Sequence, residues 1–137
     1  MCKTKEEIAS MLADLPEIPG LNSFKKPGEF NGIVQWETSK GAMLSLQLFD
    51  NPNCEVWHTL FLKYTEVKWH NHNQSYERIV VVRGKIQIIT SDGMHYLLRE
   101  KDELRIEKEV PHMAMTYDEE CEILAMTIPK EYGETTD

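Results

Sequence analysis

The stretch WHNHNQSYERIVVVRG, from Trp69 to Gly84, holds two histidines one residue apart, a glutamate, and a run of β-branched residues that closes on an Arg-Gly pair. The β-branched run favours a strand, and the polar segment before it favours a turn. Because alternate residues of a strand point to one face, His70 and His72 can reach the same point. Glu77 would join them from the start of the next strand. The stretch therefore predicts a metal site at the entrance of a hydrophobic strand.

Short strands separated by turns fill most of the chain after residue 31. The Asp92-Gly93 pair lies between two such strands and is a strong hairpin signal. Many short strands at regular spacing indicate an all-β sandwich or barrel. The expected strands are residues 32–37, 41–49, 54–63, 67–72, 77–83, 85–90, 94–99, 102–106, 111–117 and 121–128.

The N-terminal part has a different, helical pattern. Apolar residues recur over residues 4–15 at the spacing of one helix face, and Thr4 with Glu7 fits a capping box. The chain is thus expected to have three parts: an N-terminal helix and lead-in loop at 1–31, a β-barrel at 32–128, and an acidic, loosely ordered C-terminal tail at 129–137.

Two imidazoles and one carboxylate suit a divalent transition metal. A fourth ligand should come from elsewhere, and His112 in the segment VPHMAMT is the best candidate. His58 alternates with apolar residues. It is either an inward residue that acts near the pocket as a base or substrate contact, or a core or outward histidine without such a role. His95 follows the Asp-Gly turn and is expected to be exposed.

These residues resemble the first motif of the cupin family, G-x5-H-x-H-x4-E-x6-G. His70, His72, Glu77 and Gly84 match at the right spacing, whereas Tyr64 stands at the opening glycine.

The second cupin motif, G-x5-P-x-G-x2-H-x3-N, is retained only at His112. Its other positions fall on Lys101, Glu107, Glu109 and Thr116, none of which matches.

The resemblance implies an all-β fold, a double-stranded β-helix or jelly-roll barrel, which the short N-terminal helix predicted from its apolar spacing would precede. It implies one divalent first-row metal (Fe, Mn, Ni, Zn, Co or Cu) held by His70, His72, Glu77 and His112, with coordination positions left open. It further implies a small metalloenzyme of dioxygenase, isomerase or decarboxylase type that acts on a small polar molecule, in which Glu77 could also move a proton. The alternative is a non-catalytic cupin module that binds or senses a small molecule or a metal.

The charge and composition of the chain disfavour some classes of binding partner. The net charge of −8 disfavours nucleic acid and anionic membranes. The segment MCKTKEEIAS has no apolar core of a signal peptide, so a cytoplasmic location is expected, with the three cysteines as reduced thiols. The resemblance also implies a homodimer, whose interface would use the early strands, such as residues 41–49, and the N-terminal helix.

Overall fold

The computed structural model describes residues 34–130 and 134–136, and these residues form eleven strands. The strands are β1 (Val34–Trp36), β2 (Met43–Asn51), β3 (Cys54–Phe61), β4 (Glu66–His72), β5 (Tyr76–Arg83), β6 (Lys85–Thr90), β7 (His95–Arg99), β8 (Glu103–Ile106), β9 (His112–Met115), β10 (Cys121–Ile128) and β11 (Glu134–Thr136).

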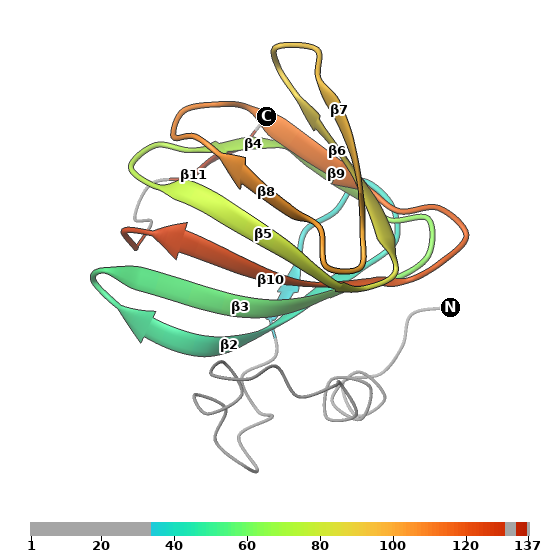
Figure 1. Cartoon of the computed structure of the whole chain (residues 1–137), viewed down its shortest axis with the longest axis horizontal. Coiled ribbons are helices and arrows are strands. Elements are labelled where there is room, and N and C mark those ends of the chain that lie inside the picture. Colours follow the sequence, from blue (N-terminus) through green and yellow to red (C-terminus); the bar gives the residue numbers. More distant parts are fainter. Residues whose placement is uncertain (1–33, 131–133, 137) are drawn as a thin grey trace.

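The strands form two antiparallel sheets (Figure 1). The first sheet has the order β1-β2-β3-β10-β5-β8, and the second has the order β11-β4-β9-β6-β7. Strands that are distant in sequence are neighbours in both sheets: β10 lies between β3 and β5, and β9 lies between β4 and β6. This interleaving of the two halves of the chain is the topology of a jelly roll.

All ten strands expected from the sequence are confirmed, with ends that shift by a few residues. The hairpin at Asp92-Gly93 is also confirmed, since β6 and β7 pair on either side of it. The expected loosely ordered tail is wrong for residues 134–136, which form β11 and pair with β4. The predicted helix at 4–15 and its lead-in loop lie outside the described residues.

The core lies between the two sheets. It combines inward residues of β5 and β10 with inward residues of β6 and β9, among them Ile79, Ile123, Ile88 and Ala114. Cys121 is a free thiol within this core, and Cys54 is a partly buried free thiol. A second apolar cluster occupies the opposite face of the first sheet, where residues of β2, β3 and β10 are buried: Leu44, Leu46, Leu48, Val56, Leu60 and Leu124. The first sheet is therefore apolar on both faces.

Gly84 makes the step from β5 to β6, where the chain passes from one sheet to the other. Its φ is +85°, and a Cβ there would lie 2.0 Å from the Glu120 carbonyl oxygen. Only glycine fits both the backbone angle and this close approach. The closing glycine of the motif is thus required by the fold itself.

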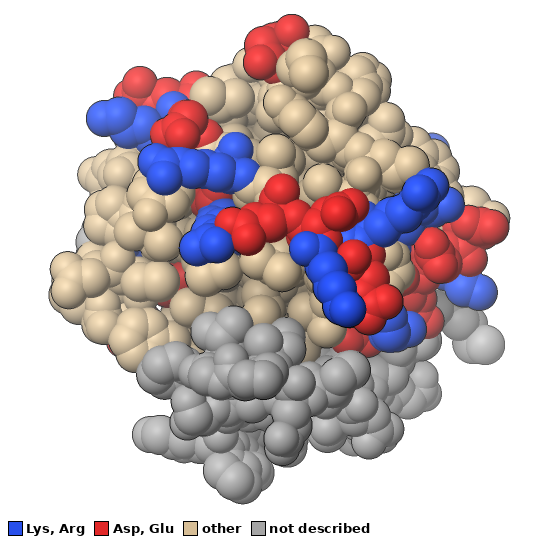
Figure 2. Space-filling view, in the orientation of Figure 1, with Lys and Arg blue, Asp and Glu red and all other residues tan. Residues whose placement is uncertain are grey.

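Charged side chains of both signs are interleaved on the face shown in Figure 2. Ion pairs join Arg78 to Glu103 and Arg105 to Glu107 on β5, β8 and the turn after β8. Within the described ranges, no helix has the length and apolar character needed to cross a membrane.

Candidate metal centre

Three histidines converge at one end of the two sheets. His70 and His112 are directly paired across β4 and β9, and His112 in turn pairs with Thr90 on β6. A register shift in the β4–β9 pairing separates Val67 from His70, which allows both to face the core side although they are three residues apart. His72 shares this face by alternation. One ring nitrogen from each of these histidines lies within 4.8 Å of the other two, so the group could hold a metal ion.

Backbone carbonyl groups orient two of the three rings. The Nδ1 of His70 lies 2.8 Å from the Lys68 carbonyl oxygen, and the Nδ1 of His112 lies 2.9 Å from the Val110 carbonyl oxygen. A carbonyl only accepts, so each Nδ1 donates its proton and each Nε2 keeps a lone pair. This is the usual arrangement for histidines that bind a metal through Nε2. In both cases the carbonyl belongs to the residue two positions before the histidine, and no side-chain identity in the sequence could have predicted it.

Glu77 reaches the same cluster from the other sheet. It is the second residue of β5, and its two carboxylate oxygens lie 3.3 Å from the Nε2 of His72 and 3.4 Å from the Nε2 of His112. The side chain of Glu77 is 13% exposed, and those of His72 and His112 are more buried. The four residues expected from the sequence therefore come together, although His70 and His72 belong to one strand and Glu77 and His112 to two others.

The electrostatics of the cluster favour a charged carboxylate. Burial alone would raise the pKa of the Glu77 carboxyl. Hydrogen bonding and charge from His112 and His72 outweigh this effect, so the pKa of Glu77 lies well below its ordinary value. A carboxylate that stays ionised between His72 and His112 is a negative site suited to a cation.

The donor set fits a divalent ion. The oxygen–nitrogen separations of 3.3 and 3.4 Å exceed those of a good charge-assisted hydrogen bond, roughly 2.7–2.9 Å. Two ligand atoms about 2.1 Å from one ion, at angles between 90° and 109°, lie roughly 3.0–3.4 Å apart. The Nε2 of His112 is also buried, and its 3.4 Å contact with the Glu77 carboxylate is long for a hydrogen bond. These spacings suit shared coordination better than direct hydrogen bonding.

Backbone contacts hold the turns around the cluster. The Glu109 amide donates to the His72 carbonyl over 2.7 Å, which joins the end of β4 to the approach to His112. The Ser75 hydroxyl donates to the Pro129 carbonyl, which joins the β4–β5 turn to the end of β10. These contacts thus fix the histidines of β4 and β9 and the Glu77 carboxylate of β5 relative to one another.

Three described residues other than glycine have the left-handed backbone angle that favours glycine. The described non-glycine residues with positive φ are Tyr64 (φ 53°), Lys101 (φ 74°) and Glu109 (φ 64°). These are the places where the motifs have glycine. The left-handed conformation is uncommon for residues other than glycine. The positions that align with motif glycines therefore have a backbone angle that favours glycine, although other residues stand there.

The other two histidines of the described chain lie elsewhere. His58 pairs with Leu124, which pairs with Val80, and this row faces away from the row that holds Glu77. His58 is buried on the outer apolar face, 3.9 Å from the carboxylate of Glu122. The interpretation of His58 as a pocket residue therefore finds no support in its position. His95 is exposed as expected and contacts Gln87.

Comparisons with known proteins agree with this fold. No protein-family model and no curated protein matches the sequence. Solved structures do match. A cupin-like protein from Thermotoga maritima is 19% identical with a TM-score of 0.67, over 72% of this chain and 77% of that one. A protein with a double-stranded β-helix domain from Klebsiella pneumoniae is 14% identical with a TM-score of 0.63, over 88% and 96%. The DMSP lyase DddQ from Ruegeria pomeroyi is 12% identical with a TM-score of 0.71, over 99% and 78%.

Proposed function

Starting from the cupin fold of this chain, a double-stranded β-helix, we propose that the protein is a small metalloenzyme that acts on a small polar molecule. The observation that carries the proposal is the convergence of His70, His72 and His112 within 4.8 Å, with the Glu77 carboxylate against two of them. A bound divalent ion would supply a Lewis acid, or a redox centre if it is iron, manganese or copper.

The protein's own residues have separate tasks in this proposal. The Lys68 and Val110 carbonyls hold two imidazoles in the tautomer that binds through Nε2. Glu77 supplies negative charge that balances part of the charge of a divalent ion. Three imidazoles and one carboxylate leave coordination positions open on most first-row ions, so oxygen atoms of a substrate could bind beside them.

Metal analysis tests the proposal directly. We expect the purified protein to hold about one first-row ion per chain, or to take up Fe(II), Mn(II), Ni(II) or Zn(II) in a titration. The His70→Ala/His72→Ala double variant should lose this binding, and the exposed control His95→Ala should keep it. A wild-type protein that is metal-free and binds none of the four added ions would contradict the proposal.

A second experiment separates catalysis from binding alone. The iron-loaded protein is supplied with a panel of small organic acids, enediols, thiols and diketones, while dioxygen uptake and product formation are followed. Turnover of one compound that depends on Glu77 supports the enzyme. Saturable binding of a compound without turnover supports the non-catalytic cupin module instead.

We also propose that the protein is a homodimer. In the first sheet, β1 pairs with β2 only over Met43–Ser45, so the outer edge of β2 beyond Ser45 has no strand partner among the described residues. Exposed strand edges favour pairing with a second copy. Size-exclusion chromatography with light scattering should give a mass of two chains, and a single-chain mass at micromolar concentration contradicts this.

A further inference from the structure

A row of polar side chains leads away from the candidate metal centre across the first sheet. Glu77 pairs with Thr127, Thr127 pairs with Glu55, and Glu55 pairs with Asp50. Directly paired residues of antiparallel strands project to the same face, so these side chains share the face of Glu77. Neighbouring strands lie about 4.8 Å apart, which places Thr127 one spacing and Glu55 two spacings from Glu77.

The buried hydroxyl of Thr127 has no hydrogen-bond partner among the described residues. The residue as a whole is 7% exposed. Buried hydroxyl groups are nearly always satisfied, because leaving one unpaired is costly. A ligand that lies between Glu77 and Glu55 would supply the missing partner.

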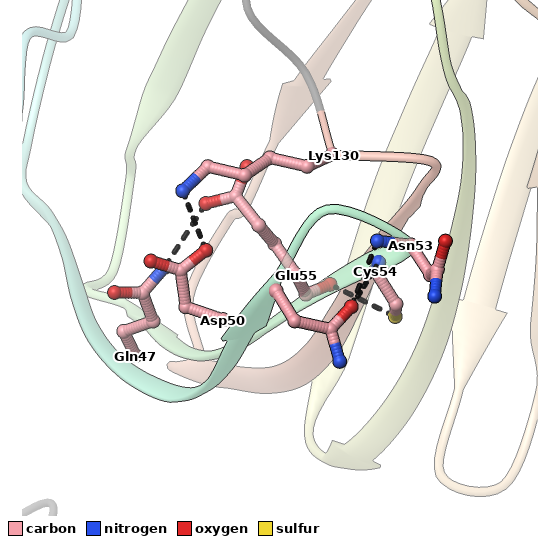
Figure 3. Close-up of polar contacts among 7 residues, drawn as sticks. Gln47, Asp50, Asn53, Cys54, Glu55 and Lys130 are labelled. Carbon is pink, nitrogen blue, oxygen red and sulfur yellow. Dashed lines mark hydrogen bonds and ion pairs between the residues drawn. The ribbon is translucent and has the colours of Figure 1, made fainter.

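Glu55 is held as an acceptor (Figure 3). The Gln47 amide donates to one Glu55 oxygen over 3.0 Å, while the Lys130 ammonium pairs with Asp50 over 2.6 Å. The nearby lysine therefore neutralises Asp50, and the Glu55 carboxylate is oriented by a neutral amide. Such a carboxylate accepts hydrogen bonds from hydroxyl groups and repels a second carboxylate.

An aromatic side chain borders the row on the side of the core. Trp57 pairs with Gln47 on one side and with Ala125 on the other, and it packs edge-on against Trp36 with ring centroids 5.4 Å apart. Gln47, Glu55 and Trp57 are only half-buried. The next row on this face consists of Ser45, Thr59 and Ile123, which pair across β2, β3 and β10. This row is buried, since each of its residues is at most 3% exposed. Solvent thus reaches Gln47, Glu55 and Trp57, and the buried row beyond them forms the floor.

We propose that Thr127, Glu55, Gln47 and Trp57 form a subsite for the hydroxylated end of a small hydroxy acid. This inference rests on the proposed function, because the carboxylate head of the ligand would bind at the His70, His72 and His112 cluster. The ligand chain then runs along the row, exchanges a hydrogen bond with the Thr127 hydroxyl, and donates another to Glu55. The distance of one to two strand spacings, about 5–10 Å, suits a chain of roughly four to six carbons.

Binding of three six-carbon acids to the zinc-loaded protein tests the subsite. The probes are gluconate, which carries hydroxyl groups, hexanoate, which has none, and adipate, which ends in a second carboxylate. We expect gluconate to bind at least about 10-fold more tightly than the other two in isothermal titration. Equal affinities for gluconate and hexanoate would overturn the inference. Tighter binding of a trimethylammonium carboxylate than of gluconate would also overturn it, because the row would then select a cation.

Two variants and a matched control complete the test. Thr127→Val removes the hydroxyl at nearly constant volume, and Glu55→Gln removes the charge; each should weaken gluconate about 10-fold and leave hexanoate unchanged. Glu103→Gln, on an exposed carboxylate of the same sheet, should change neither. Zinc titration is done first on every protein. Absent zinc binding by the wild type counts against the proposed function, whereas normal zinc binding with unaltered gluconate affinity in both variants counts against this subsite.

Discussion

His70 and His112 lie directly opposite each other on β4 and β9, with ring centroids 4.2 Å apart. Imidazoles this close must be neutral to bind one ion together, so protons and metal compete for them. We predict that zinc affinity falls by roughly 10-fold or more as the pH is lowered from 7.5 to 5.5. Isothermal titration between pH 7.5 and 5.5, in buffers of different ionisation enthalpy, measures both the affinity and the protons released. An affinity independent of pH would show that these rings are not the ligands.

Glu77 should make the stability of the metal-free protein depend on pH. Its folded pKa lies below the unfolded value of about 4.3. The carboxylate therefore stabilises the fold above that value, and the contribution is lost as the pH falls through the folded pKa. We predict that Glu77→Gln unfolds about 1–2 kcal/mol more easily than the wild type at pH 7, and that the difference narrows below pH 4. Urea unfolding in the presence of a chelator measures it, and a gap that is the same at pH 7 and pH 3 contradicts it.

Two glycines with nearly the same backbone angle should respond differently to alanine. Gly84 has φ +85° and Gly93 has φ +87°, so both pay a conformational penalty of about 1–2 kcal/mol as alanine. At Gly84 the new Cβ would also meet the Glu120 carbonyl, whereas at Gly93 nothing lies within 4 Å. We predict that Gly93→Ala folds with that loss alone and that Gly84→Ala loses more than about 3 kcal/mol or fails to fold. Equal losses in thermal unfolding would contradict the close approach at Gly84.

Restoring glycine at the altered motif positions should stabilise the protein. Tyr64, Lys101 and Glu109 adopt positive φ, which costs a non-glycine residue about 1–2 kcal/mol of stability. A glycine avoids this cost, but it loses more backbone entropy on folding, which offsets part of the gain. We predict a gain of about 0.5–1 kcal/mol for each single change to glycine. Lys108 lies beside Glu109 and is not one of the described residues with positive φ. Lys108→Gly should therefore be neutral or destabilising. Destabilisation at all three motif positions would refute this reading.

The contrast between the two motifs explains how much the sequence could predict. The strands and turns were predictable because alternation and the Asp92-Gly93 pair are local signals. His70, His72 and Glu77 were predictable because they lie close together in one short stretch of sequence. His112 was a candidate for the fourth ligand, and the resemblance supported it only through the histidine position of the second motif, since Lys101 and Glu109 stand where that motif has glycine.

Features that depend on pairing between distant strands were not predictable. The residues of β11 show no strand pattern in the sequence, because this strand is defined by its pairing with β4. The alignment of Glu55 with Thr127 and Glu77 depends on the register of β3, β10 and β5, and Glu55 and Thr127 are 72 residues apart in the chain. Alternation along β3 could not decide which face of the sheet His58 occupies, because both faces of β3 carry apolar residues.

The ion pair of Arg83 with Glu122 shows how the outer apolar face tolerates a charge. Glu122 is 1% exposed, and the Arg83 guanidinium donates two hydrogen bonds to one of its oxygens, one of them from Nε over 2.7 Å. Removing the arginine would leave a buried carboxylate without its cation. Because the arginine side chain is itself about half exposed, solvent would offset part of that loss. We predict that Arg83→Ala lowers the free energy of unfolding by about 2 kcal/mol.

The pair of Arg78 with Glu103 provides the control for this prediction. Both of its side chains are nearly half exposed, so Arg78→Ala should cost less than about 0.5 kcal/mol. Adding Glu122→Gln to Arg83→Ala should recover much of the lost stability, because the buried charge is removed together with its partner. Urea unfolding of the four proteins at pH 7 measures these differences. Equal losses for Arg83→Ala and Arg78→Ala, or no recovery in the double variant, would mean that solvent reaches Glu122 and that burial of its carboxylate does not govern stability at this face.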